Sequence, residues 1–273
     1  MKENAILPFL KWPGGKRWFI QKHADLLPGS YNRYIEPFLG GGAVFFHLQP
    51  PHAILGDINA DLITAYEALK TNWRFVKRSL EYHHRMHGTK HYYHVRDKNP
   101  THLLQQASRM IYLNRTCFNG IYRVNTNGQF NVPIGTKTEV IRDTDDFEAL
   151  SELLANADIR HVDFEVLIDE AGENDLIFAD PPYTVRHNLN GFIKYNETLF
   201  SWEDQERLAR ALILAKNRGA KVVSTNANHH SVRQLYMGQG FAFKTVSRFS
   251  PISATPENRK QFEELVILSH PND

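Results

Sequence analysis

Hydrophobic and polar positions in the first sixty residues are arranged as in a strand–helix–strand unit. A β-rich run at 33–38 leads into three glycines, and the apolar stretch 43–48 has helical character and ends before two prolines. A second strand is expected at 53–58. Because parallel strands joined through a helix form a right-handed crossover in nearly all proteins, this pattern predicts the beginning of an α/β sheet.

The middle of the chain lacks strand-and-helix alternation until about residue 157. Apolar residues recur there at helical spacing, and one stretch is rich in Asn, Gly and aromatic residues. The pattern predicts an inserted helical domain that includes a loop or hairpin. Helices are expected at 61–70, 73–86 and 103–113, and the loop or hairpin at 118–134.

Alternation returns in the last part of the chain. Ser201 and Asp204 form a capping box that predicts a helix, which ends near Gly219. The last two expected strands have no helix between them, which favours an antiparallel hairpin. The expected fold class is α/β, with a mostly parallel sheet that contains one antiparallel strand. Strands are expected at 159–164, 175–180, 221–226, 241–249 and 262–269.

Composition excludes several classes of protein. With 273 residues, 42% of them hydrophobic and 23% charged, the chain has ordinary globular usage. Its apolar runs fall far short of the roughly 20 residues that span a membrane, and its N-terminus has no apolar signal core. The single cysteine, Cys117, excludes an internal disulfide framework and a zinc site of several thiolates. The histidines show no metal-ligand spacing, so we expect a cytoplasmic protein without membrane contact or metal.

Charge is unevenly distributed along the chain. The segment 60–145 holds 13 Lys and Arg against 7 Asp and Glu, although the formal net charge of the whole chain is only +2. A basic segment in a mildly acidic frame favours binding to a polyanion. A solvated helical surface would carry the same charges, so charge alone leaves both interpretations open.

A glycine cluster follows the first expected strand. Gly40, Gly41 and Gly42 would let a ligand approach the backbone closely, but their spacing matches neither a dinucleotide fingerprint nor a phosphate loop. Asp57 ends the next strand, where a carboxylate can bind ribose hydroxyls. The pair fits a nucleoside without a pyrophosphate, and a structural tight turn explains the glycines equally well.

A second candidate site is Asp180-Pro181-Pro182-Tyr183, directly after an apolar strand. The Asp180 carboxylate and a proline carbonyl can together accept both hydrogens of an amino group. The Tyr183 ring offers a stacking surface for a flat base. These residues would suit a planar aromatic amine, and an ordinary Pro-Pro turn is as good an explanation of the tetrapeptide alone.

Several motifs in this order resemble the Dam family of DNA adenine methyltransferases. The segment 9–16 matches F-x-K-W-x-G-G-K, 36–42 matches E-P-F-x-G-x-G, and 57–62 matches D-I-N-x-D-L. The segment 112–123 contains L-N-R and N-G-x-x-R, and 128–135 matches G-x-F-N-V-P-x-G. The D-P-P-Y motif follows them, which is the order of the α group of amino-methyltransferases.

The resemblance implies an enzyme with a Rossmann-like methyltransferase fold. Such an enzyme uses S-adenosylmethionine to methylate the exocyclic N6 of an adenine flipped out of double-stranded DNA, and GATC is the expected target. It would be encoded by a bacterium or a phage, with or without a companion restriction enzyme. The catalytic domain would comprise 1–59 and 146–273, and 60–145 would be the inserted target-recognition domain.

The resemblance also implies roles for individual residues. Asp180, Pro181 and Tyr183 would be catalytic, gripping and stacking the target base. Asp163 is expected at the edge of the cofactor's adenine, although a capping aspartate is an equally simple explanation. The cofactor-binding residues would be Trp12, Lys16, Glu36, Phe38, Gly40, Gly42, Asp57, Ile58, Asp163, Phe164 and Asp180.

DNA would be contacted mainly by the insert. Arg123 would read a guanine, Lys11 would read the outer guanine, and Phe118 would wedge into the duplex. Without the resemblance, core packing of Phe118 and a surface salt bridge of Arg123 would be favoured. The DNA-binding residues implied are Lys11, Arg115, Phe118, Asn119, Ile121, Arg123, Pro133, Arg259 and Lys260.

Two other functions are compatible with parts of this pattern. A methyltransferase that acts on an RNA base or a protein glutamine could use a similar D-P-P-Y turn, but the basic insert favours DNA. A non-catalytic DNA-binding module would need neither Asp180 nor the cofactor motifs. Methyl transfer assayed on duplex DNA, RNA and protein separates the three.

Overall fold

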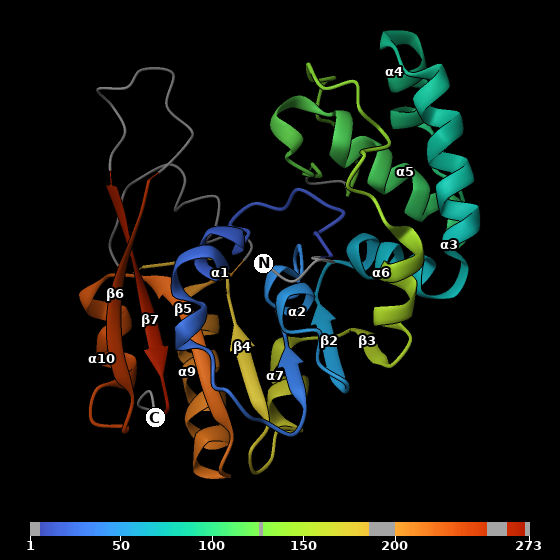
Figure 1. The fold of residues 1–273 in the computed structure, drawn as a ribbon. Helices are drawn as coiled ribbons and strands as arrows, with labels where there is room; N and C mark the ends of the chain where they lie inside the picture. The colour runs from blue at the N-terminus through green and yellow to red at the C-terminus, as the bar shows by residue number, and fades with distance from the viewer. Residues whose placement is uncertain (1–5, 126–127, 186–199, 250–260, 271–273) are drawn as a thin grey trace. The chain divides into compact units, whose positions relative to one another are not determined.

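The computed structural model describes residues 6–125, 128–185, 200–249 and 261–270 (Figure 1). It contains a seven-stranded sheet with the strand order β3-β2-β1-β4-β5-β7-β6. The strands are β1 (Tyr34–Glu36), β2 (Ala53–Asp57), β3 (Ala157–His161), β4 (Leu176–Ala179), β5 (Lys221–Ala227), β6 (Ala242–Phe249) and β7 (Gln261–Leu268).

Strand pairing confirms the predicted fold class. β1 pairs in parallel with β2 and with β4, and β4 pairs in parallel with β5. β7 lies antiparallel between β5 and β6. The chain therefore has the Rossmann-like, mostly parallel sheet with one antiparallel strand that its sequence predicts, including the late hairpin of β6 and β7.

The α-helices include several that the sequence pattern did not predict. α1, α7 and α10 have only six or seven residues, too few to show a clear repeat, and α4 is largely polar and buries only Tyr92 and Val95. α6 does carry apolar residues at helical spacing, and sequence reasoning missed it. The α-helices are α1 (Arg17–His23), α2 (Ala43–Leu48), α3 (Ala60–Met86), α4 (Thr89–Asp97), α5 (Leu103–Thr116), α6 (Phe147–Leu154), α7 (Phe164–Asp169), α9 (Trp202–Asn217) and α10 (His230–Tyr236), and the 3₁₀ turns are η1 (Ala24–Leu26) and η2 (Phe118–Gly120).

Two expected boundaries differ from those observed. The predicted helices 61–70 and 73–86 belong to the single element α3, which has a kink at Asn72 (φ −151°, ψ 59°). The Asn72 side chain accepts a hydrogen bond from the Phe75 amide and so caps the second part of α3. The strand expected at 159–164 is β3, which ends at His161 because Asp163 caps α7.

The loop or hairpin expected at 118–134 is confirmed in its described part. Two antiparallel bridges join its arms, between Cys117 and Ile134 and between Val124 and Phe130. The turn η2 lies at its start, and Asn119 within it has a positive φ of 57°. This conformation suits asparagine better than most other residues.

The chain divides by its internal packing into two compact units. Unit 1 comprises Met1–Arg17, Leu39–Pro51 and Asp57–His161, and unit 2 comprises Trp18–Phe38, His52–Gly56 and Val162–Asp273. The functional division at 60–145 that the sequence suggests remains a prediction.

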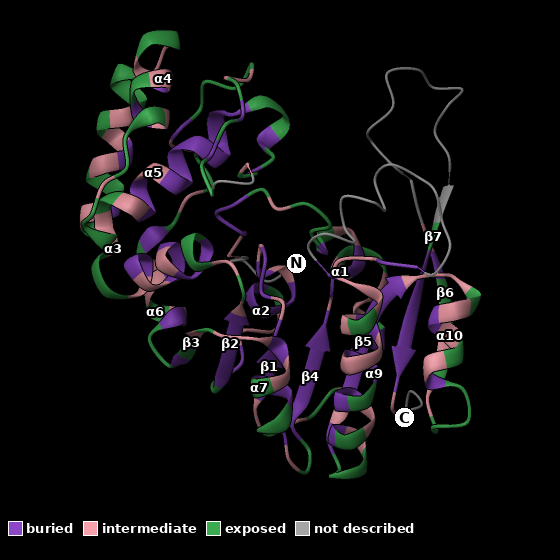
Figure 2. Cartoon of the chain, turned by 180° about the vertical axis from the view of Figure 1, so that it is seen from behind, coloured by how far each residue is buried: buried purple, intermediate pink, exposed green. Residues whose placement is uncertain are grey.

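The core of unit 2 explains why its strands and helices form. β4 is buried at all four positions, and β5 is buried from Val222 to Asn226 (Figure 2). Helix α9 buries one stripe of small and aliphatic residues, including Leu208 and Leu212, and leaves the other side exposed. This stripe has the spacing of an amphipathic helix, and the predicted capping box of Ser201 and Asp204 is present at its start.

Candidate active site

The D-P-P-Y turn of unit 2 is held in place from three directions. Asp180 follows the last residue of β4, and its Oδ1 accepts a hydrogen bond of 2.6 Å from the Thr225 hydroxyl on β5. Tyr183 donates its hydroxyl proton towards Glu264 on β7, with an oxygen–oxygen distance of 2.6 Å. The Pro182 carbonyl accepts a hydrogen bond of 3.2 Å from Gln205 on α9. The turn is therefore rigidly positioned at the carboxyl end of a central parallel strand.

A second layer of buried polar residues supports this turn. The Gln205 side chain is fully buried and accepts a hydrogen bond of 3.0 Å from Asn226. Thr184 donates to the Phe200 carbonyl at 2.6 Å, which fixes the chain directly after the turn. No described residue donates a hydrogen bond to the Pro181 carbonyl, so this carbonyl keeps its capacity to accept from an amino group.

Glu264 is a functional candidate that sequence reasoning missed. Glu264 lies in β7 and is only 3% exposed, although its side chain carries a carboxyl group. Burial, followed by the nearby charges of Asp180 and Glu264, raises the pKa of Tyr183 well above its usual value. The Tyr183 phenol therefore stays protonated. The only sequence signal for Glu264 was a carboxyl group directly before the apolar run Leu265–Leu268.

Unit 2 also holds an aromatic cluster that contains two predicted cofactor residues. Phe38 stacks on Phe164 with ring centroids 5.3 Å apart, and Phe200 contacts both rings. The Glu36 carboxylate, which is also buried, accepts a hydrogen bond of 2.8 Å from the Tyr34 hydroxyl. Glu36, Phe38 and Phe164 are thus in fixed positions within one unit.

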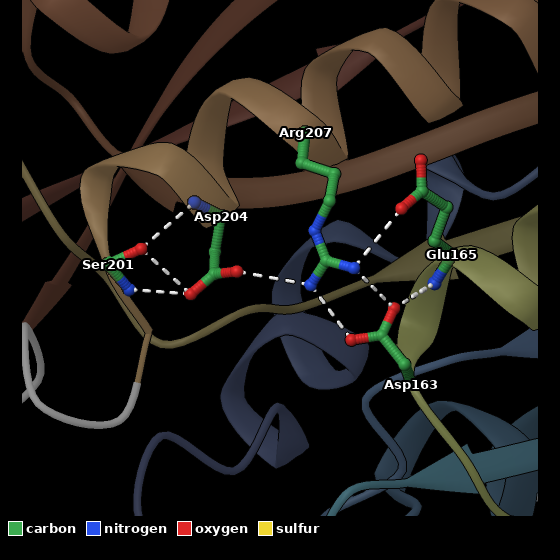
Figure 3. Close-up of polar contacts among 5 residues, drawn as sticks. All are labelled: Asp163, Glu165, Ser201, Asp204 and Arg207. Atoms are coloured by element: carbon green, nitrogen blue, oxygen red, sulfur yellow. Dashed lines mark hydrogen bonds and ion pairs between the residues drawn. The ribbon is translucent and has the colours of Figure 1, made fainter.

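The Asp163 carboxylate takes the capping role that its sequence position also allowed. It accepts from the Glu165 amide at 2.9 Å and forms two hydrogen bonds of 2.9 and 2.8 Å with Arg207 (Figure 3). Arg207 also contacts Glu165 and Asp204, and Asp204 in turn bonds Ser201 at the start of α9. This network joins the beginnings of α7 and α9, so the Asp163 carboxylate has a structural role in addition to its predicted cofactor role.

The glycine loop of unit 1 is packed too tightly for larger residues. Gly40 has a φ of +47°, and a Cβ atom on it would lie 2.8 Å from Cδ1 of Trp12. Gly42 has a φ of +64°, and a Cβ atom there would lie 2.8 Å from the Tyr66 hydroxyl. Both the conformation and the close contacts therefore require glycine. Lys16 is buried and donates to the Gly14 carbonyl at 2.9 Å.

Asp57 and Ile58 present two kinds of surface that a nucleoside needs. The Asp57 carboxylate accepts from the amides of Gly40 at 3.0 Å and Asn59 at 2.9 Å. Burial raises its pKa, and these hydrogen bonds act in the opposite direction. Ile58 beside it is 70% exposed, which is unusual for an isoleucine. A carboxylate with further acceptor capacity therefore lies next to an exposed apolar side chain, and the cofactor roles of both residues remain predictions.

A recognition turn, which we define as residues 117–124, is tied to Lys11. Asn114 holds the Lys11 backbone through two hydrogen bonds, from the Lys11 amide at 3.0 Å and to the Lys11 carbonyl at 2.8 Å. The Lys11 ammonium donates to the Asn119 carbonyl. Gly120 has a φ of +65°, and a Cβ atom on it would lie 2.6 Å from the Lys11 side chain. Lys11 and Asn119 are therefore brought together, as their shared predicted role requires.

The recognition turn exposes four of the nine side chains predicted to contact DNA, those of Phe118, Asn119, Ile121 and Arg123. Phe118 is 53% exposed and Ile121 is 43% exposed, so core packing does not explain either residue. Arg123 is exposed and forms no hydrogen bond or ion pair within the described parts of the chain, so the alternative of a surface salt bridge is not observed. Pro133 is also exposed, and its carbonyl accepts from the Phe118 amide at 2.9 Å.

The buried position of Arg115 is not compatible with a direct DNA contact in this structure. Its side chain has no exposed surface, and its guanidinium makes a bidentate ion pair with Asp145 at 2.5 and 2.8 Å. It also donates to the carbonyls of Phe9 and Val140. Arg115 occupies the buried face of α5, so its role is to join three segments of unit 1.

A cavity of about 330 Å³ lies beside the recognition turn, within unit 1. Its lining includes Lys11, Lys137 and Arg142, against one acidic residue, Glu139. Burial and the neighbouring Arg115 lower the pKa of Arg142, so the guanidinium charge is poorly solvated there. An anion would be favoured in this position.

Some expectations lie outside the described residues or concern absences. Arg259 and Lys260, predicted to contact DNA, fall within 250–260 and so outside the described residues. Over the described ranges, no three His, Cys, Asp or Glu residues are grouped so that they could hold a metal ion. Within the same ranges, no helix has the length and hydropathy needed to cross a membrane.

Comparison with known proteins agrees with the resemblance seen in the motifs. A family model described as D12 class N6 adenine-specific DNA methyltransferase matches residues 12–250. The chain is 33% identical to the type II methyltransferase M1.LlaDCHI of Lactococcus lactis subsp. cremoris, covering 100% of this chain and 99% of that protein. It is 34% identical to the type II methyltransferase M.MjaIII of Methanocaldococcus jannaschii, covering 97% and 99%.

A third relative carries the name of the family that the motifs resemble. The chain is 30% identical to the DNA adenine methylase of Haemophilus influenzae, covering 96% of this chain and 93% of that protein. The predicted enzyme class, cofactor and family are thereby confirmed. The chain belongs to the D12 class of N6 adenine-specific DNA methyltransferases, which use S-adenosylmethionine as the methyl donor.

Proposed function

We propose that this enzyme methylates the adenine of a GATC-like site after flipping it out of the duplex. The observation that carries the proposal is the D-P-P-Y turn, in which Asp180 is fixed by Thr225 and the Pro181 carbonyl accepts no hydrogen bond from described residues. Enzymes that act on a base inside a duplex must extrude it before the reacting atom is accessible. Tyr183 would stack on the extruded adenine.

Asp180 and Pro181 would activate the amino group of that adenine. Its lone pair is delocalised into the purine ring, so it is a poor nucleophile. Accepting both hydrogens, one on the carboxylate and one on the carbonyl, favours a tetrahedral nitrogen and localises the lone pair. Bound S-adenosylmethionine supplies an electrophilic methyl group on its sulfonium. The protein's contribution is therefore positioning and electrostatic stabilisation, which requires no strong prior base.

Cofactor roles are proposed for residues of each unit. In unit 1, Asp57 would hold the ribose hydroxyls and Ile58 would pack on the adenine ring. In unit 2, Phe164 would lie at the adenine edge. The other residues proposed for this role are Trp12, Lys16, Glu36, Phe38, Gly40, Gly42, Asp163 and Asp180.

DNA reading is assigned to the recognition turn and to Lys11. The exposure of Phe118 supports its role as a wedge, and the absence of any described partner for Arg123 supports its availability to a guanine. Segment 60–145 would thus be the target-recognition domain, with 1–59 and 146–273 as the catalytic domain. Asn119, Ile121 and Pro133 would lie against neighbouring bases, and Arg259 and Lys260 are proposed from the sequence alone. The basic lining of the cavity at Lys137 and Arg142 supports additional contacts to DNA phosphates.

Mapping of methylated bases tests this proposal. The chain would be expressed in a bacterial host that lacks adenine methylation, with an Asp180→Ala variant as control, and N6-methyladenine would be mapped by sequencing. We expect methylation in GATC with the wild type and none with the variant. Methylation confined to another sequence would overturn the GATC assignment, and methylation by the variant would overturn the role of Asp180. Because relatives occur in bacteria and a phage, we propose the cytoplasm as its place of action.

A further inference from the structure

A buried carboxylate lies behind the D-P-P-Y turn and has no role in the scheme above. Glu264 is 3% exposed and is followed along β7 by four buried aliphatic residues, Leu265–Leu268. An ionised carboxyl group in such surroundings is strongly unfavourable unless it is hydrogen-bonded. Glu264 Oε2 accepts a hydrogen bond of 2.6 Å from the Tyr183 hydroxyl. A buried carboxyl group directly beside the residue proposed to stack on the target base indicates a role in the reaction.

Tyr183 has a single hydroxyl proton, so it can donate only one strong hydrogen bond to the carboxylates around it. The Tyr183 hydroxyl has one proton and lies 2.6 Å from Glu264 Oε2 but 3.3 Å from Asp180 Oδ1. The contact with Glu264 is much the shorter of the two, so the proton lies towards Glu264. Asp180 Oδ1 takes its short hydrogen bond, of 2.6 Å, from Thr225. Each carboxylate therefore has its own hydroxyl donor.

We propose that Glu264 is a positioning residue for methyl transfer, acting through Tyr183. By holding the hydroxyl proton of Tyr183, it prevents that proton from turning to Asp180. It also fixes the plane of the ring against which the target adenine would stack. This inference rests on the proposed roles of Asp180 and Tyr183 in binding the target base.

Loss of the Glu264 carboxylate should redirect the Tyr183 hydroxyl. Asp180 Oδ1 is an alternative acceptor, already within 3.3 Å. Asp180 would then accept two hydroxyl protons on one oxygen, and its charge would be partly neutralised. A weaker acceptor localises the amine lone pair less well, so the methyl-transfer step would slow while cofactor binding would be retained.

The test compares Glu264→Leu, Tyr183→Phe and the double variant. Single-turnover methyl transfer would be measured on a duplex oligonucleotide carrying the target site, together with S-adenosylmethionine titration and thermal unfolding. Glu264→Leu should slow methyl transfer about tenfold, the ratio that a hydrogen bond of average net strength represents. Cofactor affinity should change less than twofold. Thermal unfolding of each variant shows whether a slower rate comes from loss of the fold instead.

The double variant gives the most specific result. If Glu264 acts by controlling the Tyr183 proton, removal of that hydroxyl should restore the rate of Glu264→Leu to that of Tyr183→Phe alone. A residue that merely supports the fold would instead give a double variant at least as slow as Glu264→Leu, which would overturn the inference. Glu263→Leu is the matched control, because Glu263 is the exposed neighbour on the same strand and should leave the rate unchanged.

Two further variants separate a failure of the Glu264 inference from a failure of the proposed role of Asp180. Glu264→Gln retains the volume and an acceptor oxygen, so it should slow the reaction about threefold and should also be rescued by Tyr183→Phe; it replaces Glu264→Leu if that variant does not fold. Asp180→Ala is assayed in parallel. Turnover by Asp180→Ala would refute the proposed catalytic role, whereas an inactive Asp180→Ala with wild-type rates for both Glu264 variants would refute the present inference alone.

Discussion

The D-P-P-Y turn of unit 2 and the recognition turn of unit 1 both carry proposed functional residues. They differ in whether those side chains already have hydrogen-bond partners within the protein. Asp180 and Tyr183 are hydrogen-bonded to buried or partly buried neighbours. Phe118 and Arg123 extend into solvent, and the described residues offer Arg123 no partner. A group that acts on a reacting atom is positioned before substrate arrives. A group that reads DNA gains its partner only on binding.

The largest expected effect comes from removing the carboxylate that we propose to be catalytic. Asp180→Ala should lower methyl transfer by about a thousandfold or more, as loss of one preorganised electrostatic group does in other enzymes. Binding of S-adenosylmethionine should largely survive, since the other cofactor residues remain. Single-turnover rates and a cofactor titration of the same preparation test this. Parallel loss of both properties would mean that the turn supports the fold of the cofactor site instead.

The comparison predicts that two arginines of unit 1 differ strongly in their effect on stability. Arg115→Ala leaves the buried Asp145 carboxylate unpaired, which should lower the free energy of unfolding by about 3–5 kcal/mol. Arg123→Ala removes an exposed side chain and should change it by less than about 0.5 kcal/mol. Urea unfolding of both variants tests the contrast. An Arg115→Ala protein of unchanged stability but reduced DNA affinity would restore Arg115 as a DNA contact.

The interior of unit 1 should also make stability depend on pH. His83 bonds His91 at 2.9 Å and stacks on Tyr112, and burial, helped by His91, lowers its pKa to about 4. The folded state therefore favours the neutral ring. This stabilisation is complete above the unfolded pKa of about 6.5 and is lost as the pH falls towards 4, by at most about 3 kcal/mol. Unfolding of His83→Phe should show a smaller decrease over this range, and an unchanged decrease would exclude His83 as its source.

Cofactor affinity should depend on Asp57 more than turnover does. Loss of hydrogen bonds to a charged acceptor costs about 1.5–3 kcal/mol, so Asp57→Ala should weaken S-adenosylmethionine binding at least tenfold. Asp57→Asn keeps an oxygen for the Gly40 or Asn59 amide and is the matched variant that separates loop geometry from charge. Isothermal titration measures the S-adenosylmethionine affinity of both variants, and a turnover assay at saturating cofactor gives the smaller effect on rate. Unchanged affinity in Asp57→Ala would show that the ribose is held elsewhere.

Sequence patterns correctly predicted those helices and strands that are determined by residues close together in the chain. The capping box of Ser201 and Asp204 begins α9, and the strand-like run before Asp180 forms β4. The late pair of strands formed the expected hairpin because no helical spacing separates them. The kinked helix α3 was predicted in two parts because Asn72 interrupts the apolar spacing without ending the helix.

The supporting residues of the site could not be predicted in the same way. Thr225 and Glu264 contact the D-P-P-Y turn across separations of 45 and 81 residues, which no local pattern encodes. Arg115 was assigned to DNA although Ile111, one turn earlier on α5, is buried. Residues four apart share a helix face, so the apolar spacing already indicated that Arg115 points inwards. Arg123 was assigned to DNA only through the family resemblance, because the local sequence does not separate base reading from a surface salt bridge, and its role stays a prediction.

The most direct test of the account is the effect of Arg123 on target choice. We would measure kcat/KM for wild type and Arg123→Ala on duplexes that carry every single-base change of GATC, at one fixed salt concentration, with Lys137→Ala as the control for a phosphate contact. A bidentate arginine–guanine pair contributes about 1–3 kcal/mol of discrimination, so Arg123→Ala should lose roughly ten- to hundredfold selectivity at one guanine and keep it elsewhere. Lys137→Ala should weaken all duplexes alike. A uniform loss with Arg123→Ala would contradict the assignment of base reading to the recognition turn.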